Sequence, residues 1–357
     1  MLNELAIPII QAPMLGATTA EIAIAVSQAG GLGFLAAAGS SPARLVQDVA
    51  AIRSATDKPF GVNIFIQDEI SPESTTVEAA LKRLKPWRER YGLPSQTLPN
   101  RWAEFFKDQF AALLEAAPPA ASFTFGCLTR DDARALKACG TFVIGTATTV
   151  AEAKAWAAAG ADAICAQGFE AGGHRGTFLN TVWESSIGTL ALVRTIAKAV
   201  DLPVIAAGGI MDGAGIAAAL LLGAAAVQLG TAYLLCEEAI TNAAWRQAID
   251  AAPDDPTRLT RVISGRYARG IENEFMRALQ PVEAEIPAYP IQNALTQDLR
   301  AAAVRANSPD VLSLWAGQGV KLARPAKAAD LTAALWRETG EILESRSREI
   351  LARFRSH

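Results

Sequence analysis

Imidazole and thiol groups are scarce in this 357-residue chain, which contains only two histidines and four cysteines. One histidine is the last residue, His357, and the other, His174, lies in the glycine-rich stretch QGFEAGGHRG (167–176). The cysteines form no CxxC pair and no zinc spacing, so we expect free thiols in a reducing compartment rather than a disulfide framework. No HExxH, P-loop or EF-hand string occurs, and the sequence therefore offers no metal site.

Long runs of one charge and long apolar runs are also missing. The 33 basic and 36 acidic residues give a formal net charge of −3, which makes nucleic acid or an anionic membrane surface a poor partner. The nearest candidate for a membrane span, residues 216–235, is interrupted by Gly223, Gln228 and Gly230, as in a helix followed by a turn and a strand. The first 13 residues lack the basic region of a signal peptide. We therefore expect a cytoplasmic protein with no membrane partner.

The chain does contain a repeated alternation of short apolar runs with alanine-rich helical segments. The runs are apolar throughout, which is typical of parallel strands covered on both faces, and they lie at 8–13, 32–37, 60–65, 122–126, 141–146, 162–168, 203–209 and 226–234. Helix candidates between them span 19–30, 41–56, 129–140, 149–160, 184–201 and 212–224. Eight such units predict an α/β fold, a TIM (β/α)8 barrel. A doubly wound sheet is the alternative, because strand number alone does not prove closure.

Two stretches interrupt this alternation of apolar runs and helical segments. Residues 66–120 contain two further helical segments among several prolines, which predicts an insertion after the third strand. Residues 236–315 are polar and punctuated by proline, as expected for a smaller, mainly helical lobe. We therefore predict a barrel over residues 1–240, a helical lid or substrate lobe over 241–315, and C-terminal helices over 316–357 that return to the barrel.

One glycine motif is not expected to bind a dinucleotide. GLGFLA (31–36) has the form G-x-G-x-x-A, but it follows the first helix and opens the second strand. A dinucleotide fingerprint has the reverse order, with the glycines after a strand and before a helix. We interpret this stretch as a helix C-cap and a tight turn.

The glycines after the seventh and eighth strands are better placed to hold a ligand. Gly209 ends PVIAAGG, and Gly230 and Thr231 follow the next apolar run. Loops at these two positions of a TIM barrel often bind phosphate through backbone N–H groups, and glycine leaves room for the oxygens. The amides of Asn63 and Gln167, which end the third and sixth strands, are candidates for the wall of the same mouth. Ordinary turns and structural amides are the alternative.

Several strings together make the chain similar to the class I nitronate monooxygenases, formerly called 2-nitropropane dioxygenases. They are IIQAPMLGATT, FGVNIF, AQGFEAGGHRG, AAGGIMDGAGIAAALLLGAAAVQLGTAYL and WAGQ, and QGxEAGGHxG is the most specific part. The resemblance covers nearly the whole chain. It implies that FMN accepts an electron from an alkyl nitronate such as propionate 3-nitronate, that O2 combines with the resulting radical species, and that a carbonyl compound leaves with nitrite or nitrate. Detoxification is the implied role.

The resemblance also implies particular residues. The active-site histidine of the family falls on His174. The residues implied to hold FMN, from the ring and ribityl end to the phosphate end, are Asn63, Gln167, Gly172, Gly209, Gln228, Leu229, Gly230 and Thr231. The barrel over residues 1–240 would then be the FMN-binding part of the chain.

The chemistry of His174 has two interpretations. A neutral imidazole can remove a proton from a nitroalkane carbon, whereas a protonated or hydrogen-bonding imidazole can hold the nitro oxygens of a nitronate that is already formed. Near it in the sequence, we expect Glu170 to hold its loop through backbone N–H groups and Arg175 to contact solvent or the lobe. Cys165 is expected in the core, and Tyr289 over the mouth as a lid residue.

Two other functions compete with this one. An FMN-dependent NAD(P)H reductase of the enoyl-ACP reductase or quinone reductase type would share the fold and a similar GGH loop. A barrel that only binds a phosphate ligand is the third hypothesis, although a mouth with amides and an imidazole disfavours it. A homodimer is one assembly that the sequence leaves open.

Overall fold

The chain forms a closed barrel of parallel strands. The computed structural model describes residues 1–355, except for the side chain of Arg355, so His357 lies outside the described residues. The barrel strands are paired in the order β1-β9-β8-β6-β5-β4-β3-β2. Their bounds are β1 (Ile9–Gln11), β2 (Gly33–Ala36), β3 (Phe60–Phe65), β4 (Ala120–Thr124), β5 (Phe142–Ala147), β6 (Ala163–Gln167), β8 (Val204–Ala207) and β9 (Ala226–Leu229).

The barrel closes between β1 and β2. A parallel bridge joins Ile10 to Leu32, and the Gln11 N–H donates to the Leu32 carbonyl at 3.0 Å. The buried side chain of Gln11 continues this seam, because its Oε1 accepts a hydrogen bond from the Phe34 N–H at 3.0 Å. A doubly wound sheet keeps two free edges, so this closure confirms the TIM barrel and excludes the alternative.

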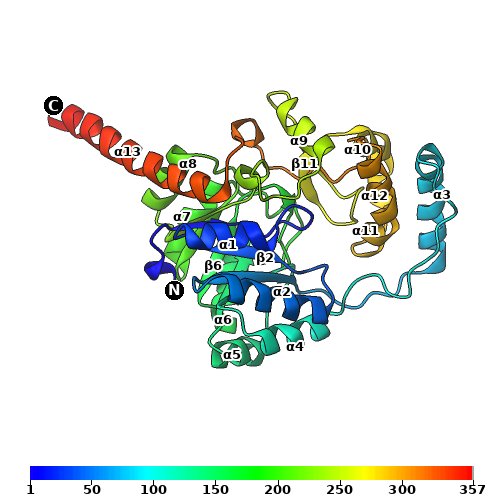
Figure 1. Cartoon of the computed structure of the whole chain (residues 1–357), viewed down its shortest axis with the longest axis horizontal. Helices are drawn as coiled ribbons and strands as arrows, with labels where there is room; N and C mark the ends of the chain where they lie inside the picture. Colours follow the sequence, from blue (N-terminus) through cyan, green and yellow to red (C-terminus); the bar gives the residue numbers. More distant parts are fainter. Residues whose placement is uncertain (356–357) are drawn as a thin grey trace.

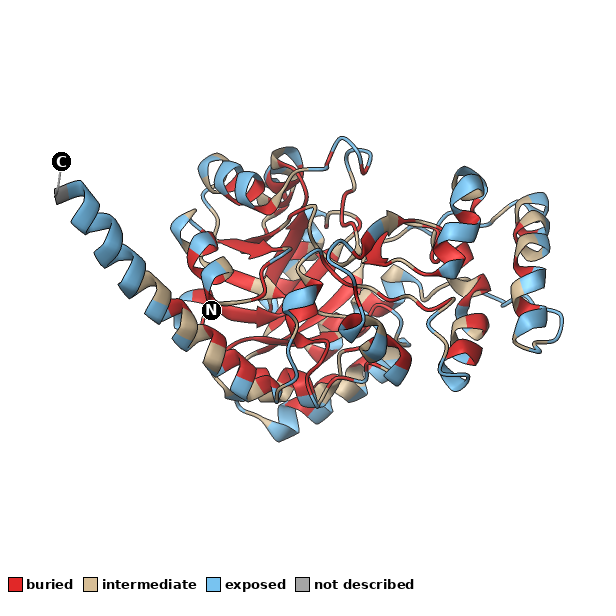
Figure 2. Cartoon of the chain, turned by 90° about the horizontal axis from the view of Figure 1, so that it is seen from above, coloured by how far each residue is buried: buried red, intermediate tan, exposed pale blue. Residues whose placement is uncertain are grey.

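Helices surround the barrel on its outside (Figure 1). The helices that alternate with the strands are α1 (Ala20–Gln28), α2 (Pro42–Ala55), α4 (Phe106–Ala116), α5 (Arg130–Ala138), α6 (Val150–Ala159), α7 (Thr189–Ala199) and α8 (Gly213–Leu221). The long helix α13 (Ala328–Arg355) packs on α8 and α1 and so fills the eighth helix position. Figure 2 shows the barrel strands buried and the distal part of α13 exposed.

The apolar runs and cap signals of the sequence predict most of these elements. Each of the eight runs overlaps a barrel strand, although β4 begins at Ala120, before its predicted run. Thr19, Ser41, Thr129 and Thr149 cap their helices with side-chain hydrogen bonds. Two further boundaries were wrong. The last strand ends at Leu229, before a 3-10 turn (Thr231–Tyr233). Helix α7 begins only at Thr189, because the Glu170 carboxylate accepts hydrogen bonds from the N–H and hydroxyl of Thr189 at the start of the helix.

The lobe contains strands that the sequence did not predict. It comprises α9 (Ala243–Asp250), β10 (Thr257–Thr260), β11 (Ala268–Ile271), α10 (Glu274–Leu279), a 3-10 segment (Gln280–Glu285), α11 (Ile291–Leu295) and α12 (Gln297–Arg305). The strands β10 and β11 form an antiparallel sheet with β7 (Gly173–His174), which belongs to the glycine-rich loop after β6. These strands are too short for their alternation to stand out in the sequence.

The insertion after β3 contributes one helix to the lobe and one helix to the barrel. Helix α3 (Ser74–Arg90) packs against α11, and Val77, Ala80 and Leu84 share an apolar cluster with the lobe. Helix α4 instead packs on α2 of the barrel, and the two helices lie far apart in Figure 1. The predicted division of the chain at residues 240 and 315 stays a prediction. No helix among residues 1–355 is long and apolar enough to cross a membrane.

The GLGFLA stretch is the predicted turn. Gly30 follows α1 with a φ of +97°, the left-handed conformation that glycine adopts at helix C-termini. Gly33 opens β2 directly against α1, where an added Cβ would lie 2.0 Å from the Ala23 carbonyl oxygen. This glycine is therefore required by the packing of a helix on a strand, not by a ligand.

We predict that Gly33→Ala destabilises the fold by at least about 2 kcal/mol, because backbone rather than a flexible side chain opposes the new methyl group. Gly340→Ala is the matched control. Gly340 is exposed in α13, and no atom lies within 4 Å of its added Cβ, so alanine should stabilise the helix by about 0.5–1 kcal/mol. Thermal unfolding followed by circular dichroism tests both, and equal midpoints for the two variants would contradict the prediction.

Candidate active site

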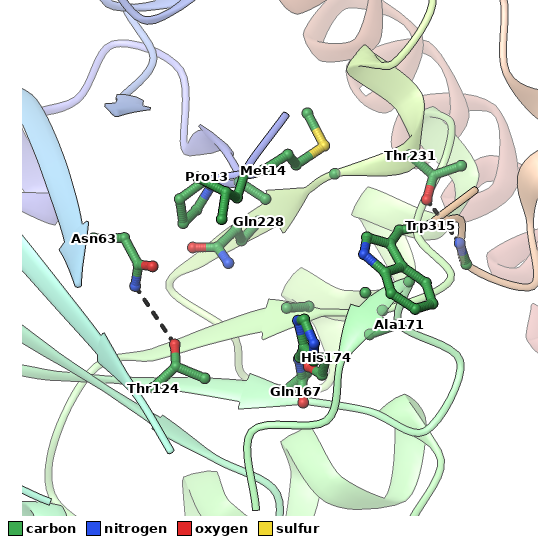
Figure 3. A pocket seen from close by; sticks show the side chains of 18 of the residues that line it. Pro13, Met14, Asn63, Thr124, Gln167, Ala171, His174, Gln228, Thr231 and Trp315 are labelled. Carbon is green, nitrogen blue, oxygen red and sulfur yellow. Dashed lines mark hydrogen bonds between the residues drawn. The ribbon is translucent and has the colours of Figure 1, made fainter. Parts of the chain in front are cut away.

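A cavity of about 360 Å³ opens at the carboxyl ends of the barrel strands, beneath the lobe. Residues from β3, β6, β8 and β9 line its barrel side, and residues 289–319 line its lobe side. This is the face on which TIM-barrel enzymes carry their active sites. Figure 3 shows Asn63, Gln167, His174 and Gln228 around this cavity, with Trp315 beside His174.

His174 is held between the barrel and the lobe. Its backbone pairs with Ala268 of β11, and its Nε2 lies 2.8 Å from the hydroxyl of Ser264. Four aromatic rings surround the imidazole at centroid distances of 5.6–6.3 Å: Phe65, Phe125, Tyr289 and Trp315. The ring is therefore fixed from both sides and partly shielded from water.

Its surroundings keep His174 neutral. Burial, together with the positive charges of Arg266 and Arg300, lowers the pKa of His174 from 6.5 to about 3. Both the loss of hydration and nearby cations disfavour the imidazolium form. At neutral pH the side chain therefore has one N–H donor and one lone pair.

The hydrogen bonds around Ser264 favour one tautomer of His174. The single O–H of Ser264 can donate to the Arg266 carbonyl, 3.1 Å away. With that bond made, the Ser264 oxygen accepts from the imidazole, and the His174 proton resides on Nε2. Nδ1 then carries the lone pair, which is the atom that can accept a proton.

The two amides predicted as wall residues both line the cavity, but each is partly engaged by the protein. The Asn63 Nδ2 donates to Ser122 at 2.9–3.0 Å, which leaves Oδ1 to accept from a ligand. The Gln167 Nε2 donates to the His174 carbonyl at 2.9 Å, and its Oε1 accepts from the Gly176 N–H at 2.8 Å. Gln167 therefore fastens the histidine loop to the end of β6.

The glycine pair before His174 serves two purposes. A Cβ on Gly172 would lie 2.5 Å from the backbone of Ala316 and Gly317, so this glycine lets the WAGQ segment cross the loop. Gly173 has a φ of +73° with open space around it. The requirement at Gly172 is thus packing of the chain against itself, although the residue also lines the cavity.

The predictions for the neighbouring residues had different outcomes. Glu170 was expected to hold its own loop through backbone N–H groups, but its carboxylate accepts from a single one, the Thr189 N–H at the start of α7, at 2.9 Å. The prediction that Arg175 contacts solvent or the lobe was wrong for its side chain, which is 4% exposed. Its guanidinium donates to the carbonyls of Gln167 and Ser185. Cys165 is buried, which raises its pKa to about 12.

The loops after β8 and β9 leave a set of donors for an anion. Among the described residues, the N–H groups of Gly209 and Gly230 donate to no protein acceptor, and both residues line the cavity. An added Cβ on Gly230 would be in ordinary contact, at 3.5 Å from Ala12 and Met14. The Thr231 hydroxyl oxygen accepts from the Gly317 N–H at 2.9 Å, which leaves its O–H free to donate. These groups form a cradle that fits a phosphate.

Gln228 and Leu229 are the other two residues of the run 228–231 that were implied to hold FMN, and only the first faces the cavity. Gln228 lines the cavity, and no hydrogen bond engages its amide within the described chain. The side chain of Leu229 is 1% exposed and packs in the barrel core. Leu229 therefore lies beside the site without lining it.

Sequence reasoning missed part of the site. Ser264, Phe125 and Arg300 had no motif to mark them, whereas Phe65 belongs to the quoted FGVNIF, Trp315 belongs to the quoted WAGQ, and Tyr289 was expected at the mouth. Phe125 has a φ of +81°, a conformation that non-glycine residues rarely adopt and that concentrates at functional sites. No group of metal-binding side chains occurs within residues 1–355.

The chain is similar to known proteins over nearly its whole length. The family described as nitronate monooxygenase matches residues 1–338. A nitronate monooxygenase of Pseudomonas aeruginosa is 47% identical over 335 residues, which cover 93% of this chain and 95% of that protein. A solved structure of nitroalkane oxidase from Streptomyces ansochromogenes is 39% identical with a TM-score of 0.89, over 96% of this chain and 99% of that one.

A second solved structure is less similar. FabK from Thermotoga maritima is 30% identical with a TM-score of 0.75, and the match covers 98% of each chain. Both the identity and the TM-score favour the first group of relatives. The chain belongs to the nitronate monooxygenase family.

Proposed function

We propose that this chain is an FMN-dependent oxidoreductase that uses O2 to oxidise alkyl nitronates, such as propionate 3-nitronate, to a carbonyl compound with release of nitrite or nitrate. Family membership supports flavin dependence in general and a small-molecule substrate. The observation that carries the proposal is a single cavity with a neutral imidazole on one wall and a phosphate cradle on another. A cytoplasmic location and a homodimer stay predictions from the sequence.

The cradle supports FMN as the flavin. FMN ends in one phosphate, and the free N–H groups of Gly209 and Gly230 with the hydroxyl of Thr231 offer donors for it. Asn63 and Gln228 have unengaged amide atoms on the cavity wall, which suit the polar edge of a flavin ring. When bound, FMN supplies the electron acceptor that no side chain of this protein can provide.

His174 suits the role of a base. With its N–H donated to Ser264, the imidazole offers a lone pair at Nδ1 rather than a hydrogen bond to nitro oxygens. A nitroalkane must lose a proton from carbon before it becomes a nitronate, and an unprotonated imidazole can accept that proton. The surrounding aromatic rings limit access of water to the reacting carbon.

The proposed activity has a direct test. The purified protein should be yellow, release FMN on denaturation, and consume O2 with propionate 3-nitronate. Anaerobic mixing separates this function from the reductase alternative: nitronate should bleach the flavin absorbance rapidly, and NADH should not. Rapid bleaching by NADH alone would support the reductase, and a colourless protein that cannot be reconstituted with FMN would exclude both.

Replacing His174 should separate the two kinds of substrate. We expect His174→Ala to keep FMN and to lose about 10²- to 10⁴-fold in kcat/KM with a nitroalkane, the usual range for a general base. The loss with preformed nitronate should be much smaller, because no proton needs to be removed. Equal activity of the variant and the wild type on both substrates would remove His174 from the mechanism.

The pH profile gives the same prediction a second readout. A histidine base with an ordinary pKa loses activity as the pH falls below 6.5, because it becomes protonated. The lowered pKa of His174, about 3, moves that loss to far more acidic pH. The kcat/KM for a nitroalkane should therefore stay level between pH 7.5 and pH 5, and a descending limb centred near pH 6.5 would contradict this account.

Gly230 tests the phosphate cradle. We expect Gly230→Ala to leave thermal stability nearly unchanged, because its Cβ meets the protein only at ordinary contact distances. The methyl group should instead take space needed by the phosphate and weaken FMN binding by about tenfold or more. Titration of the apoprotein with FMN, followed by flavin fluorescence, measures this, with Gly340→Ala as the control. Unchanged FMN affinity would place the phosphate elsewhere.

A further inference from the structure

One charged side chain faces the cavity without an explanation in the proposed chemistry. Arg300, on α12, is the only Asp, Glu, Lys or Arg among the described residues that line the cavity. The wall is otherwise made of apolar, aromatic, glycine and neutral polar residues. A single cation in such a wall needs a reason, because a charge removed from water is costly unless it is paired.

The protein pairs this guanidinium only with neutral oxygens. Nη1 donates to the Thr296 hydroxyl at 2.8 Å, and Nη2 donates to the carbonyl and side-chain oxygens of Asn293 at 3.2 and 3.0 Å. These bonds use at most three of the five N–H groups of an arginine. No carboxylate of the described residues forms an ion pair with Arg300, in contrast to Arg88, which is paired with Asp298 on the same helix.

The charge is present at neutral pH. Burial lowers the pKa of Arg300 to about 10, which still leaves the guanidinium protonated near pH 7. Asn293, which orients it, lines the cavity as well. The two side chains thus present a positioned cation next to an amide, a pairing that suits a planar carboxylate.

Arg300 belongs to the substrate end of the cavity. Its positive charge acts on both His174 and Tyr289, and these two rings lie 5.7 Å apart. The phosphate cradle is built from other parts of the chain, at Gly209, Gly230 and the contact of Thr231 with Gly317. A flavin phosphate in that cradle leaves Arg300 without an anion.

We propose that Arg300 is a specificity-determining residue that binds a carboxylate on the substrate, at the end remote from the carbon that carries the nitro group. This inference rests on the proposed function and narrows it to nitronates that carry a second negative charge, such as propionate 3-nitronate. Asn293 holds the guanidinium in place. Nitronates with a purely alkyl tail occupy the same cavity without a partner for this charge.

A matched pair of substrates tests the assignment. Propionate 3-nitronate and propyl-1-nitronate have three carbons each and differ by a carboxylate in place of a methyl group. In the FMN-loaded enzyme, Arg300→Gln should reduce kcat/KM for propionate 3-nitronate by about 10- to 100-fold, as expected for loss of a charge-assisted hydrogen bond. The change for propyl-1-nitronate should stay below about threefold. Arg300→Lys should recover part of the loss.

The controls separate recognition from folding and from cofactor binding. Arg305→Gln removes a charge from an exposed position on the same helix and should change neither substrate. FMN content and thermal midpoint should match the wild type in the Arg300 variants. An equal loss on both substrates, or no loss on either, would overturn the assignment.

A binding measurement distinguishes failure of this inference from failure of the proposed function. Anaerobic calorimetry with 3-nitropropionate should give binding to the wild type that weakens about tenfold or more in Arg300→Gln. If the wild type oxidises no nitronate but binds 3-nitropropionate in this Arg300-dependent way, the function fails and the carboxylate site stands. If nitronates are oxidised and both substrates and binding are indifferent to Arg300, the function stands and the carboxylate site fails.

Discussion

The antiparallel pairing of two short strands, β7 and β11, is the interaction on which the site depends. It joins Gly173 and His174 of the barrel to Arg269 and Ala268 of the lobe. Without this pairing the imidazole would lie on a glycine-rich loop that is held from the barrel side by the side chains of Gln167 and Arg175. With it, the same backbone bonds that attach the lobe also fix the position of the histidine.

The cavity between the barrel and the lobe is lined by a positive charge, that of Arg300, without a compensating negative one. No acidic side chain of the described residues lines it, and two cations of the lobe, Arg266 and Arg300, act on the imidazole. Such an environment favours an unprotonated base, because a protonated one would add a further positive charge, and it favours an anionic ligand, because an anion compensates the cations already present. A nitronate, a carboxylate and a flavin phosphate are all anions, so the positive charge of the cavity suits each of these ligands.

Much of the barrel is predictable because its signals are local. A buried parallel strand must be apolar throughout, and a helix must begin at a cap, so eight runs and several Thr and Ser caps suffice to count the units. The lobe is different. The strand β11 pairs with β10 on one side and with β7 on the other. The sequences TRLT and ARGI contain no pattern that indicates this pairing. Helix α3 likewise joins the lobe through contacts with residues some 200 positions later.

By itself the sequence determined the strand count, the glycine loops, the family resemblance and the placing of His174 on the catalytic face. These features depend on residues close together in the chain or on recurrent strings. Only the tertiary structure decided that Leu229 points into the core, that Arg175 is buried, that Ser264 holds the imidazole and that Arg300 faces the cavity. The physical reason is that a side chain's partner and its hydration are set by groups distant in sequence, here 90 residues apart for His174 and Ser264.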